Sequence, residues 1–244
     1  MGNIMTFNRT EKKYFMTEDT YRIFLAAISP FIEAGDFPRS RIQNLYFDTP
    51  DFYYIRNSID AVNYKEKVRL RCYGDASPDS TVFLEIKKKC NGIVYKRRET
   101  MKLREAEFYI RTGLMPKATQ IMKEIDYTVK QREDTAPAVY ISYDRDSYRA
   151  KEDHDIRITF DSNILARVND LDLKSGIYGN RVIPENTRLL EIKVSDHMPI
   201  WLAKALSLYR IYPASFSKYG KAYRDGLWKY YTDKKEVEKN VINF

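Results

Sequence analysis

The sequence predicts an α+β fold: an antiparallel β-barrel that forms a tunnel with a polar, basic lumen and helices packed outside. In the segment around Lys67, Arg69 and Arg71, these cations alternate with Val68 and Leu70. A strand through them has one cationic face and one apolar face, because side chains two apart share a face. At least four other segments alternate in the same way. Helical segments with apolar stripes lie between them and can cover the apolar faces from outside.

The first third of the chain contains both strand and helix signals. Thr17 is a candidate N-cap, and apolar residues spaced three and four apart follow it. Pro30 ends this helix near Ser29. Around it we expect a strand over 6–14, a strand over 41–47 and a short helix over 51–57.

Three successive strands are predicted with a tight connection between the last two. They cover 66–74, 81–90 and 93–101, and a loop over 74–79 joins the first pair. Asn91-Gly92 suits a two-residue type I′ turn, which joins antiparallel neighbours.

The second half continues the mixture of strands and helices. Helices are expected over 103–111, over 116–130 with Pro116 at its first position, from Pro199 to 209, and after Ser217. Strands are expected over 138–149, 155–161 and 188–194, with a loop over 169–186. No repeat or Gly/Ser linker divides the chain, so we expect one domain over 1–232 and a charged tail over 233–244.

Composition favours an acidic partner and an intracellular setting. The 244 residues include 42 Lys and Arg against 34 Asp and Glu, a net charge of +8. This excess suits a phosphorylated small molecule, an anionic membrane or nucleic acid. Cys72 and Cys90 form no CxxC pair, and the N-terminus has no apolar signal region, so a cytoplasmic location is expected.

The charged strand faces allow two interpretations. One such face is ordinary, because a half-buried strand normally exposes polar residues to water. Several faces rich in Arg and Lys instead indicate a cationic lumen. Two unit charges ~4 Å apart repel by ~4 kcal/mol at an effective dielectric of ~20, so this lumen would need a polyanion to fill it.

Familiar catalytic motifs are absent from the sequence. It has no GxxxxGK[ST] loop and no GxGxxG element. His154 and His197 lie in turn-like segments that suggest surface positions. The remaining means are positioning, positive charge and a metal ion, which suffice for phosphoryl transfer.

Several segments, in the same order along the chain, resemble the VTC domain family. The VTC domain is the catalytic domain of the vacuolar transporter chaperone polyphosphate polymerase. That family belongs to the triphosphate tunnel metalloenzyme, or CYTH-like, superfamily. The resemblance covers roughly residues 7–231. The segments that carry it are Tyr46-Phe47-Asp48-Thr49-Pro50, Lys67-Val68-Arg69-Leu70-Arg71, Leu84-Glu85-Ile86-Lys87, Val94-Tyr95-Lys96-Arg97-Arg98, Leu190-Glu191-Ile192-Lys193 and Ser217-Lys218-Tyr219-Gly220.

The resemblance implies roles for individual residues. Catalytic positions would be Arg69, Arg71, Lys87 and Lys218. Phosphate-binding positions would be Lys13, Lys96, Tyr143, Arg145, Arg157, Lys193 and Ser217. Glu191 and Glu11 would bind the metal, Mn²⁺ or Mg²⁺. The superfamily signature ExExK corresponds here to Arg9-Thr10-Glu11-Lys12-Lys13, which lacks the first acid and so suggests weaker metal binding at this end.

The resemblance implies a transferase that adds the ATP γ-phosphate to polyphosphate, with pyrophosphate as a possible primer. A tunnel triphosphatase acting on tripolyphosphate or a nucleoside triphosphate is the alternative from the same fold. A non-catalytic polyphosphate-binding module is a third hypothesis. Nucleic acid is not expected, because the acids in the same strands would repel a duplex. No transmembrane run is present in the sequence, and another chain could recruit the protein to a membrane.

Overall fold

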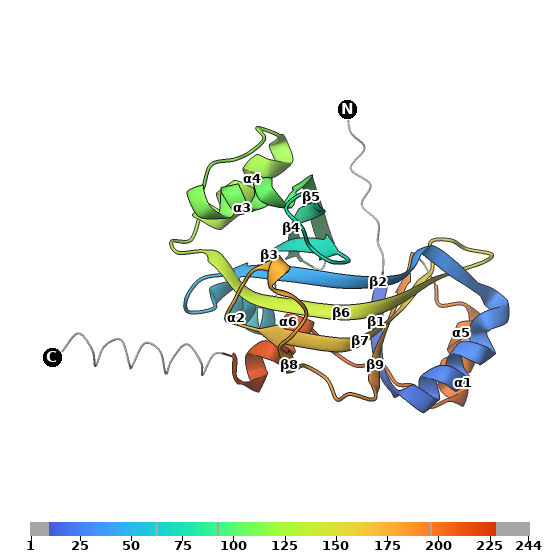
Figure 1. Ribbon diagram of the computed structural model, residues 1–244. Helices are drawn as coiled ribbons and strands as arrows, with labels where there is room; N and C mark the ends of the chain where they lie inside the picture. Colours follow the sequence, from blue (N-terminus) through green and yellow to red (C-terminus); the bar gives the residue numbers. More distant parts are fainter. Residues whose placement is uncertain (1–9, 62, 92, 196, 228–244) are drawn as a thin grey trace. The chain divides into compact units, whose positions relative to one another are not determined.

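The computed structural model describes residues 10–61, 63–91, 93–195 and 197–227. Within them the chain forms nine strands and six α-helices, so the predicted α+β class is confirmed (Figure 1). The strands are β1 Thr10–Thr17, β2 Ile32–Asp48, β3 Tyr64–Tyr73, β4 Thr81–Cys90, β5 Ile93–Lys102, β6 Ala136–Ala150, β7 Arg157–Arg167, β8 Asn180–Arg181 and β9 Thr187–Val194. The helices are α1 Glu18–Ile28, α2 Tyr53–Asp60, α3 Leu103–Thr112, α4 Gln120–Lys130, α5 Ile200–Leu208 and α6 Lys218–Ala222. None of the helices in this described part is long and apolar enough to cross a membrane.

The strands pair in the order β1-β9-β7-β6-β2-β3-β4-β5, with β8 on β7. The pairs β1–β9, β9–β7, β7–β8, β2–β3, β3–β4 and β4–β5 are antiparallel; for example, Lys13 lies opposite Glu191 and Leu70 lies opposite Leu84. The predicted antiparallel sheet is therefore confirmed. The order is open over the described residues, with β1 and β5 at its ends, so no hydrogen-bonded pair completes the expected ring of strands there.

The described residues group into two compact units. Unit 1 contains 10–41, 143–164 and 183–216, without residue 196. Unit 2 contains 42–142, without residues 62 and 92, together with 165–182 and 217–227. The expected domain boundary at 232 and the tail over 233–244 lie outside the described residues and stay predictions.

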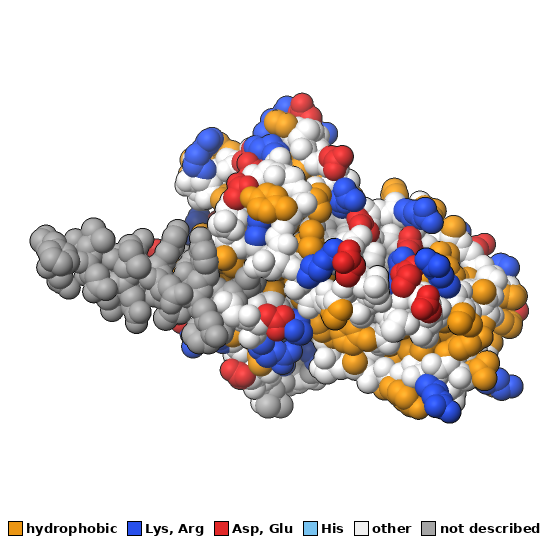
Figure 2. All heavy atoms as spheres, turned by 60° about the horizontal axis from the view of Figure 1, so that its bottom comes forward, with side chains coloured by type: hydrophobic (Ala, Val, Ile, Leu, Met, Phe, Trp, Pro, Cys, Tyr) orange, Lys and Arg blue, Asp and Glu red, His pale blue; other side chains and the backbone are white. Residues whose placement is uncertain are grey.

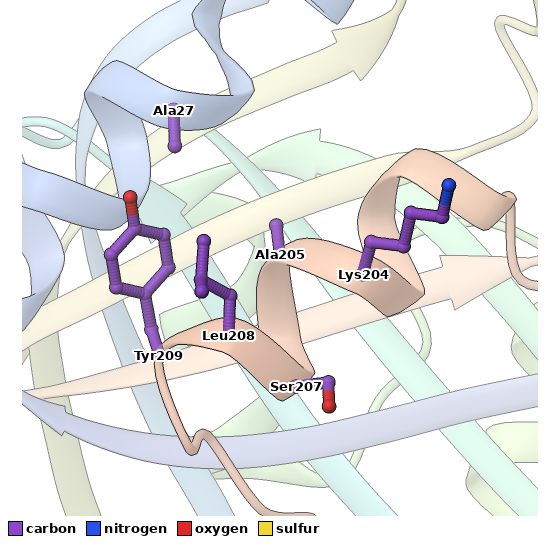
Figure 3. A pocket seen from close by; sticks show the side chains of 6 residues that line it. All are labelled: Ala27, Lys204, Ala205, Ser207, Leu208 and Tyr209. Carbon is purple, nitrogen blue, oxygen red and sulfur yellow. The ribbon is translucent and has the colours of Figure 1, made fainter.

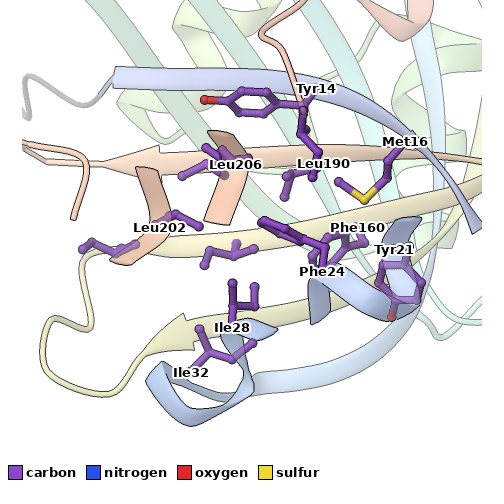
Figure 4. Close-up of a cluster of buried hydrophobic side chains, with 14 of the residues drawn as sticks. Tyr14, Met16, Tyr21, Phe24, Ile28, Ile32, Phe160, Leu190, Leu202 and Leu206 are labelled. Atoms are coloured by element: carbon purple, nitrogen blue, oxygen red, sulfur yellow. The ribbon is translucent and has the colours of Figure 1, made fainter. Parts of the chain in front are cut away.

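Unit 1 has a core between α1, α5 and the apolar face of its strands (Figure 4). Thr17 caps α1 as predicted, because its hydroxyl accepts a hydrogen bond from the Thr20 N–H at 3.2 Å. Phe24 of α1 is fully buried and meets Phe160 of β7 edge to face, with 6.3 Å between the ring centroids. Leu202 of α5 is buried in the same cluster. The helices of unit 1 therefore cover apolar strand faces, as the alternation predicted.

Unit 2 has a second core beneath α3 and α4. Leu70 of β3 and Leu84 of β4 are buried, which confirms the predicted alternation in both strands. Tyr109 of α3 and Ile125 of α4 pack in the same cluster. Because helices cover this apolar face, the cations that share the parity of Lys67 and Lys87 lie on the opposite face of the sheet. Arg97 of β5 is an exception, because it lies opposite Ile86 and pairs with Glu124 of α4.

β2 is the element that differs most from its prediction. It has 17 residues, whereas the sequence indicated a strand over 41–47 alone. Gly35 and Pro38 lie inside it, although both residues are unusual within strands. A Cβ atom on Gly35 would lie 2.9 Å from Ser147 Oγ on β6, so glycine permits a close approach of the two strands in unit 1.

Smaller differences have local causes. α4 begins at Gln120 and not at Pro116, because the Thr119 hydroxyl accepts a hydrogen bond from the Met122 N–H at 3.1 Å and caps the helix there. β1 covers 10–17; of the predicted strand over 6–14, residues 6–9 lie outside the described residues. β7 extends to Arg167. The hairpin of β4 and β5 is confirmed by its antiparallel pairing, while Gly92 of the predicted turn lies outside the described residues.

Phe24→Ala should lower the free energy of unfolding by about 3–5 kcal/mol, because it removes a fully buried ring and leaves a cavity. Ile23→Ala is the matched control at the next position of α1, where the side chain is 55% exposed. Its effect should stay below about 1 kcal/mol. Urea denaturation followed by circular dichroism measures both. Equal losses would contradict the assignment of Phe24 to the core.

Candidate functional site

Two clusters of charged side chains contain the site residues predicted from the sequence, one cluster in each unit. Unit 2 contains Arg69, Arg71, Lys87, Lys96, Ser217 and Lys218. Unit 1 contains Glu11, Lys13, Tyr143, Arg145, Arg157, Glu191 and Lys193. The role of each residue stays a prediction, and the geometry below shows which residues contact one another.

In unit 2, cations lie in rows across three neighbouring strands. Lys67 of β3 is opposite Lys87 of β4, which is opposite Lys96 of β5. Directly opposed residues of antiparallel strands share a face. The next row places Glu85 between Arg69 and Arg98. We call Lys67, Arg69, Arg71, Glu85, Lys87, Lys96 and Arg98 the cationic cluster.

Glu85 is the buried anion of the cationic cluster, and its side chain is only 2% exposed. It accepts hydrogen bonds from Arg69 Nε at 2.7 Å and from Arg98 Nε at 2.9 Å. Lys96 Nζ lies 2.6 Å from its Oε1, and Arg71 Nε lies 4.0 Å from its Oε2. Burial raises the pKa of Glu85, but Arg69, Arg71 and Lys96 outweigh burial and hold that pKa far below its ordinary value.

The cationic cluster has six Lys and Arg residues and one acid. Its formal excess is therefore five positive charges at neutral pH. Arginine binds the oxygens of phosphate or carboxylate through two parallel hydrogen bonds, and lysine adds point charges. Five of these cations lie in two rows, and Arg71 lies beside them opposite Phe83. This arrangement suits an extended anion with several charged groups.

Tyr46 of β2 adjoins the cationic cluster, and the sequence reasoning did not identify it. It lies opposite Arg69 in register, and its hydroxyl accepts a hydrogen bond from Arg69 Nη1 at 3.3 Å. Burial alone would raise the pKa of Tyr46, but Arg69, Arg71 and Lys67 together lower it to about 8. The signal in the sequence was the alternation of Asn44 and Tyr46 with apolar Leu45 and Phe47.

The segment that contains Ser217 is fixed beside β3 in unit 2. Lys67 Nζ donates a hydrogen bond to Ser217 Oγ at 3.3 Å. The Tyr219 hydroxyl donates to Asp48 Oδ2 at 2.7 Å, and its ring lies 5.0 Å from that of Tyr46. Ser217 also caps α6, so Lys218 begins a helix that starts next to the cationic cluster.

In unit 1, acids and cations are nearly balanced. Lys13 of β1 lies opposite Glu191 of β9, and Glu11 lies opposite Lys193. Lys13 Nζ is 3.2 Å from a Glu11 oxygen and 3.6 Å from a Glu191 oxygen. Lys193 Nζ is 3.6 Å from the other Glu11 oxygen. We call Glu11, Lys13, Tyr143, Arg145, Arg157, Asp161, Glu191 and Lys193 the mixed cluster.

Arg145 is the best-connected cation of the mixed cluster. Two of its nitrogens donate to the two Asp161 oxygens at 2.6 and 2.7 Å, and Nη2 also donates to Glu191 Oε2 at 3.0 Å. Burial lowers the pKa of Arg145, but Asp161, Tyr143 and Glu191 outweigh burial and raise it. Its guanidinium lies 5.2 Å from the centre of the Tyr143 ring. Arg145 therefore fixes the Glu191 carboxylate. Arg157 belongs to the cluster because it lies opposite Lys193 in the β7–β9 register.

Glu11 and Glu191 fit a divalent cation. Their carboxylates approach the same Lys13 ammonium, so this position already attracts a cation. Two carboxylates are a sufficient protein contribution for Mg²⁺, which usually keeps several waters and binds substrate phosphates as well. Among the described residues no three His, Cys, Asp or Glu side chains group as a metal site. The protein would supply these two ligands, and the remaining ligands would come from water and substrate.

Comparison with known protein families shows which family the chain belongs to. The model of the VTC domain family matches residues 8–225. The chain belongs to the VTC domain family. This match includes every site residue named above, so the predicted resemblance is confirmed. No curated protein sequence matches this VTC domain.

Solved structures share the fold of the VTC domain at low identity. A candidate adenylate cyclase from Bacillus halodurans is 13% identical, with a TM-score of 0.55 over 85% of this chain and 92% of that one. A candidate adenylyl cyclase from Hippeastrum, described as having a dominant triphosphatase activity, is 14% identical. Its TM-score is 0.52 over 88% of this chain and 95% of that one. At these identities the likeness is one of fold alone.

The charge of the cationic cluster should fall as pH rises through about 8. Burial lowers the pKa of Lys96 to about 8, although Glu85 opposes this shift. The Lys96 ammonium therefore loses its charge as pH rises through about 8. Over the same range Tyr46 changes from neutral to negative. Both changes remove positive charge, so the affinity for a polyanion such as tripolyphosphate should be roughly tenfold lower at pH about 9 than at about 7.

The double variant Lys96→Arg/Tyr46→Phe is the control for this pH dependence. It keeps a cation at one position and has no phenol at the other, so its affinity should change much less. Ionisation of tripolyphosphate itself affects both proteins equally. Isothermal titration calorimetry without metal measures the two ratios, and equal ratios would exclude these two groups as the cause.

Proposed function

We propose that this VTC domain is a metal-dependent polyphosphate polymerase that transfers the ATP γ-phosphate to a growing inorganic polyphosphate chain. The observation that carries the proposal is the cationic cluster, with five cations in two aligned rows, and Arg71 beside them, around one buried acid. An anion with many phosphates in a row matches such rows better than a single carboxylate. Family membership supports the same substrate class.

The cationic cluster would bind and neutralise phosphates. Arg69 and Arg71 would contact phosphate oxygens, and Lys87 would neutralise negative charge that develops during transfer. Lys96 would add a point charge to the same row. Ser217 and Lys218 would approach from the start of α6, which Tyr219 anchors.

The mixed cluster would hold the divalent cation, Mn²⁺ or Mg²⁺, through Glu191 and Glu11. When bound, that ion neutralises phosphate oxygens and orients them. Arg145 keeps the Glu191 carboxylate in place. Lys13, Lys193, Arg157 and Tyr143 would contribute the remaining phosphate contacts.

The transfer itself needs little chemistry from the protein. An oxygen of the acceptor's terminal phosphate forms a bond to the γ-phosphorus of ATP. The bond from that phosphorus to the β–γ bridging oxygen breaks, and ADP leaves with the electron pair. An ionised phosphate oxygen carries no proton that a side chain must remove, so positioning and positive charge suffice.

Hydrolysis of tripolyphosphate or a nucleoside triphosphate is the second candidate function. The Hippeastrum protein of similar fold is described as a triphosphatase. Water, unlike phosphate, must lose a proton as it attacks. Tyr46 beside the cationic cluster has a pKa of about 8, and its phenolate form could accept that proton, so this hydrolysis would accelerate as pH rises through about 8.

We place the reaction in the cytoplasm, where ATP is supplied. The partners proposed are ATP, polyphosphate and a pyrophosphate primer, with no nucleic acid. The whole of 1–232 would form the functional domain.

Purified protein with ATP, Mn²⁺ and a pyrophosphate primer should produce polyphosphate and ADP. Gel electrophoresis of the product and an ADP assay measure the two. Phosphate release from tripolyphosphate without chain growth would favour the triphosphatase. A thermal stabilisation by polyphosphate without turnover under either metal would favour a binding module.

Glu191→Gln should lower the rate of phosphate transfer by roughly 100-fold or more, because the neutral amide weakens metal binding and charge stabilisation. Glu33→Gln is the matched control, since Glu33 is an acid of unit 1 that pairs with Arg149 outside the mixed cluster. Steady-state kinetics across a Mn²⁺ titration, with melting temperatures for both variants, separates lost function from lost fold. An unchanged rate in the Glu191 variant would remove this residue from the proposed metal site.

A further inference from the structure

The charged face of unit 2 continues beyond the cationic cluster, toward the hairpin that joins β4 to β5. Lys65 of β3 lies directly opposite Lys89 of β4. Both share the parity of Lys67 and Lys87, so they lie on the same face, one row further along the strands. We call Lys65 and Lys89 the distal pair. Strands rise about 3.3–3.4 Å per residue, so the face extends for ~20 Å from Arg71 to Lys65.

The distal pair has no acid beside it, in contrast to cations on the opposite face of the same strands. There Lys88 Nζ lies 3.7 Å from a Glu66 oxygen, and Arg97 Nε lies 3.5 Å from a Glu124 oxygen. Among the described residues, no carboxylate forms an ion pair with either lysine of the distal pair, and this includes Asp60, which ends α2 shortly before β3. The positive charge of the distal pair is therefore available to an anion from outside.

Lysines lie opposite lysines in successive rows of this face: Lys65 and Lys89, Lys67 and Lys87, and Lys87 and Lys96. Like charges directly opposite one another destabilise a strand pair. Glu85 belongs to the neighbouring row, where Arg69 and Arg98 already contact it. Residues 86–98 include six Lys and Arg and no Asp or Glu. An anion that reaches the distal pair would relieve repulsion that the protein itself does not offset.

We propose that the distal pair binds the far stretch of a polyphosphate chain whose terminal phosphates lie on the cationic cluster. This inference rests on the polyphosphate binding proposed above, and it adds that the protein distinguishes long chains from short ones. A polyphosphate chain is negative along its whole length, so successive rows can contact successive phosphates. Tripolyphosphate is too short to extend from Arg71 to Lys65. Affinity should therefore rise with chain length.

The groove between α1 and α5 in unit 1 offers no comparable row of cations. It has a volume of about 510 Å³, and Ala27 of α1 points toward the α5 side chains that line it (Figure 3). Lys204 is the charged residue of its lining, beside apolar residues such as Leu208. Figure 2 shows hydrophobic side chains gathered over α1 and α5, at the right of the view, with side chains of both charge signs around them. A long phosphate chain therefore fits the charged face of unit 2 better.

Isothermal titration calorimetry of the full chain, without metal or ATP, tests the proposal with long-chain polyphosphate and with tripolyphosphate. Lys65→Gln/Lys89→Gln should lower the affinity for the long chain roughly tenfold, because two charge contacts are lost. The affinity for tripolyphosphate should fall less than about threefold, since the distal pair lies ~13 Å from the Glu85 row and the Debye length is ~8 Å at physiological salt. Equal losses for the two anions, or no loss for either, overturn the proposal.

Lys123→Gln/Lys204→Gln is the matched control, because it removes the same charge from exposed lysines of α4 and α5 outside both clusters. It should bind both anions like the unmodified protein. A loss for the long chain as large as that of the distal-pair variant would assign the effect to net charge and overturn the proposal.

The distal-pair variant should melt at or above the temperature of the unmodified protein, because it removes opposed like charges. If the double variant unfolds, Lys89→Gln alone repeats the test at an exposed position and should give a smaller loss for the long chain only. A single-stranded oligonucleotide that binds the unmodified protein more tightly than long-chain polyphosphate would identify another polyanion as the ligand and overturn the proposal.

These measurements separate the inference from the proposed function. Binding of both anions with no selective loss in the distal-pair variant overturns the inference alone, and polyphosphate synthesis is measured independently. A selective loss for the long chain without any synthesis from ATP would contradict the polymerase and support the distal pair. Failure of the unmodified protein to bind either anion would contradict both.

Discussion

Glu85 is a buried carboxylate on which the charged face of β3, β4 and β5 depends. Arg69, Lys96 and Arg98 all approach it within hydrogen-bonding distance. Without this anion those cations would repel one another in a partly desolvated environment, and removing one partner of a buried charge pair is strongly destabilising. The single Glu85 carboxylate offsets the repulsion between these cations, and the face still has a large positive excess. Stability comes from the apolar face beneath α3 and α4, so the charged face can serve binding.

The period-2 alternation of β3 and β4 was sufficient to predict their bounds to within two residues, because each of these strands has one face covered by helices. β5 is mostly exposed and does not alternate, and its start was predicted from the Asn91-Gly92 turn. β2 was predicted poorly because Gly35 and Pro38 interrupt the pattern, yet both lie inside the strand. The glycine is accounted for only by the close approach of Ser147, a residue more than a hundred positions away.

The candidate site was predictable as a set of residue types and faces, but not as a set of contacts. Alternation says which side chains share a face, whereas contacts depend on which strands are neighbours. Arg145 meets Asp161 and Glu191 because β6, β7 and β9 lie next to one another in the order β9-β7-β6. Tyr46 was missed for a related reason: its importance comes from the register of β2 with β3, which places it opposite Arg69.

The low pKa of Tyr46 depends on the positive charge around its side chain, so the protonation of Tyr46 reports changes in that charge. A polyanion on the cationic cluster would offset Arg69, Arg71 and Lys67, and the phenol would then hold its proton more tightly. Phenolate and phenol absorb ultraviolet light differently. Burial raises the pKa of Tyr21 and Tyr109, which stay neutral in mildly alkaline solution. We therefore expect a polyanion bound to this face to change the protein's ultraviolet absorption near pH 8 through Tyr46, without any attached label.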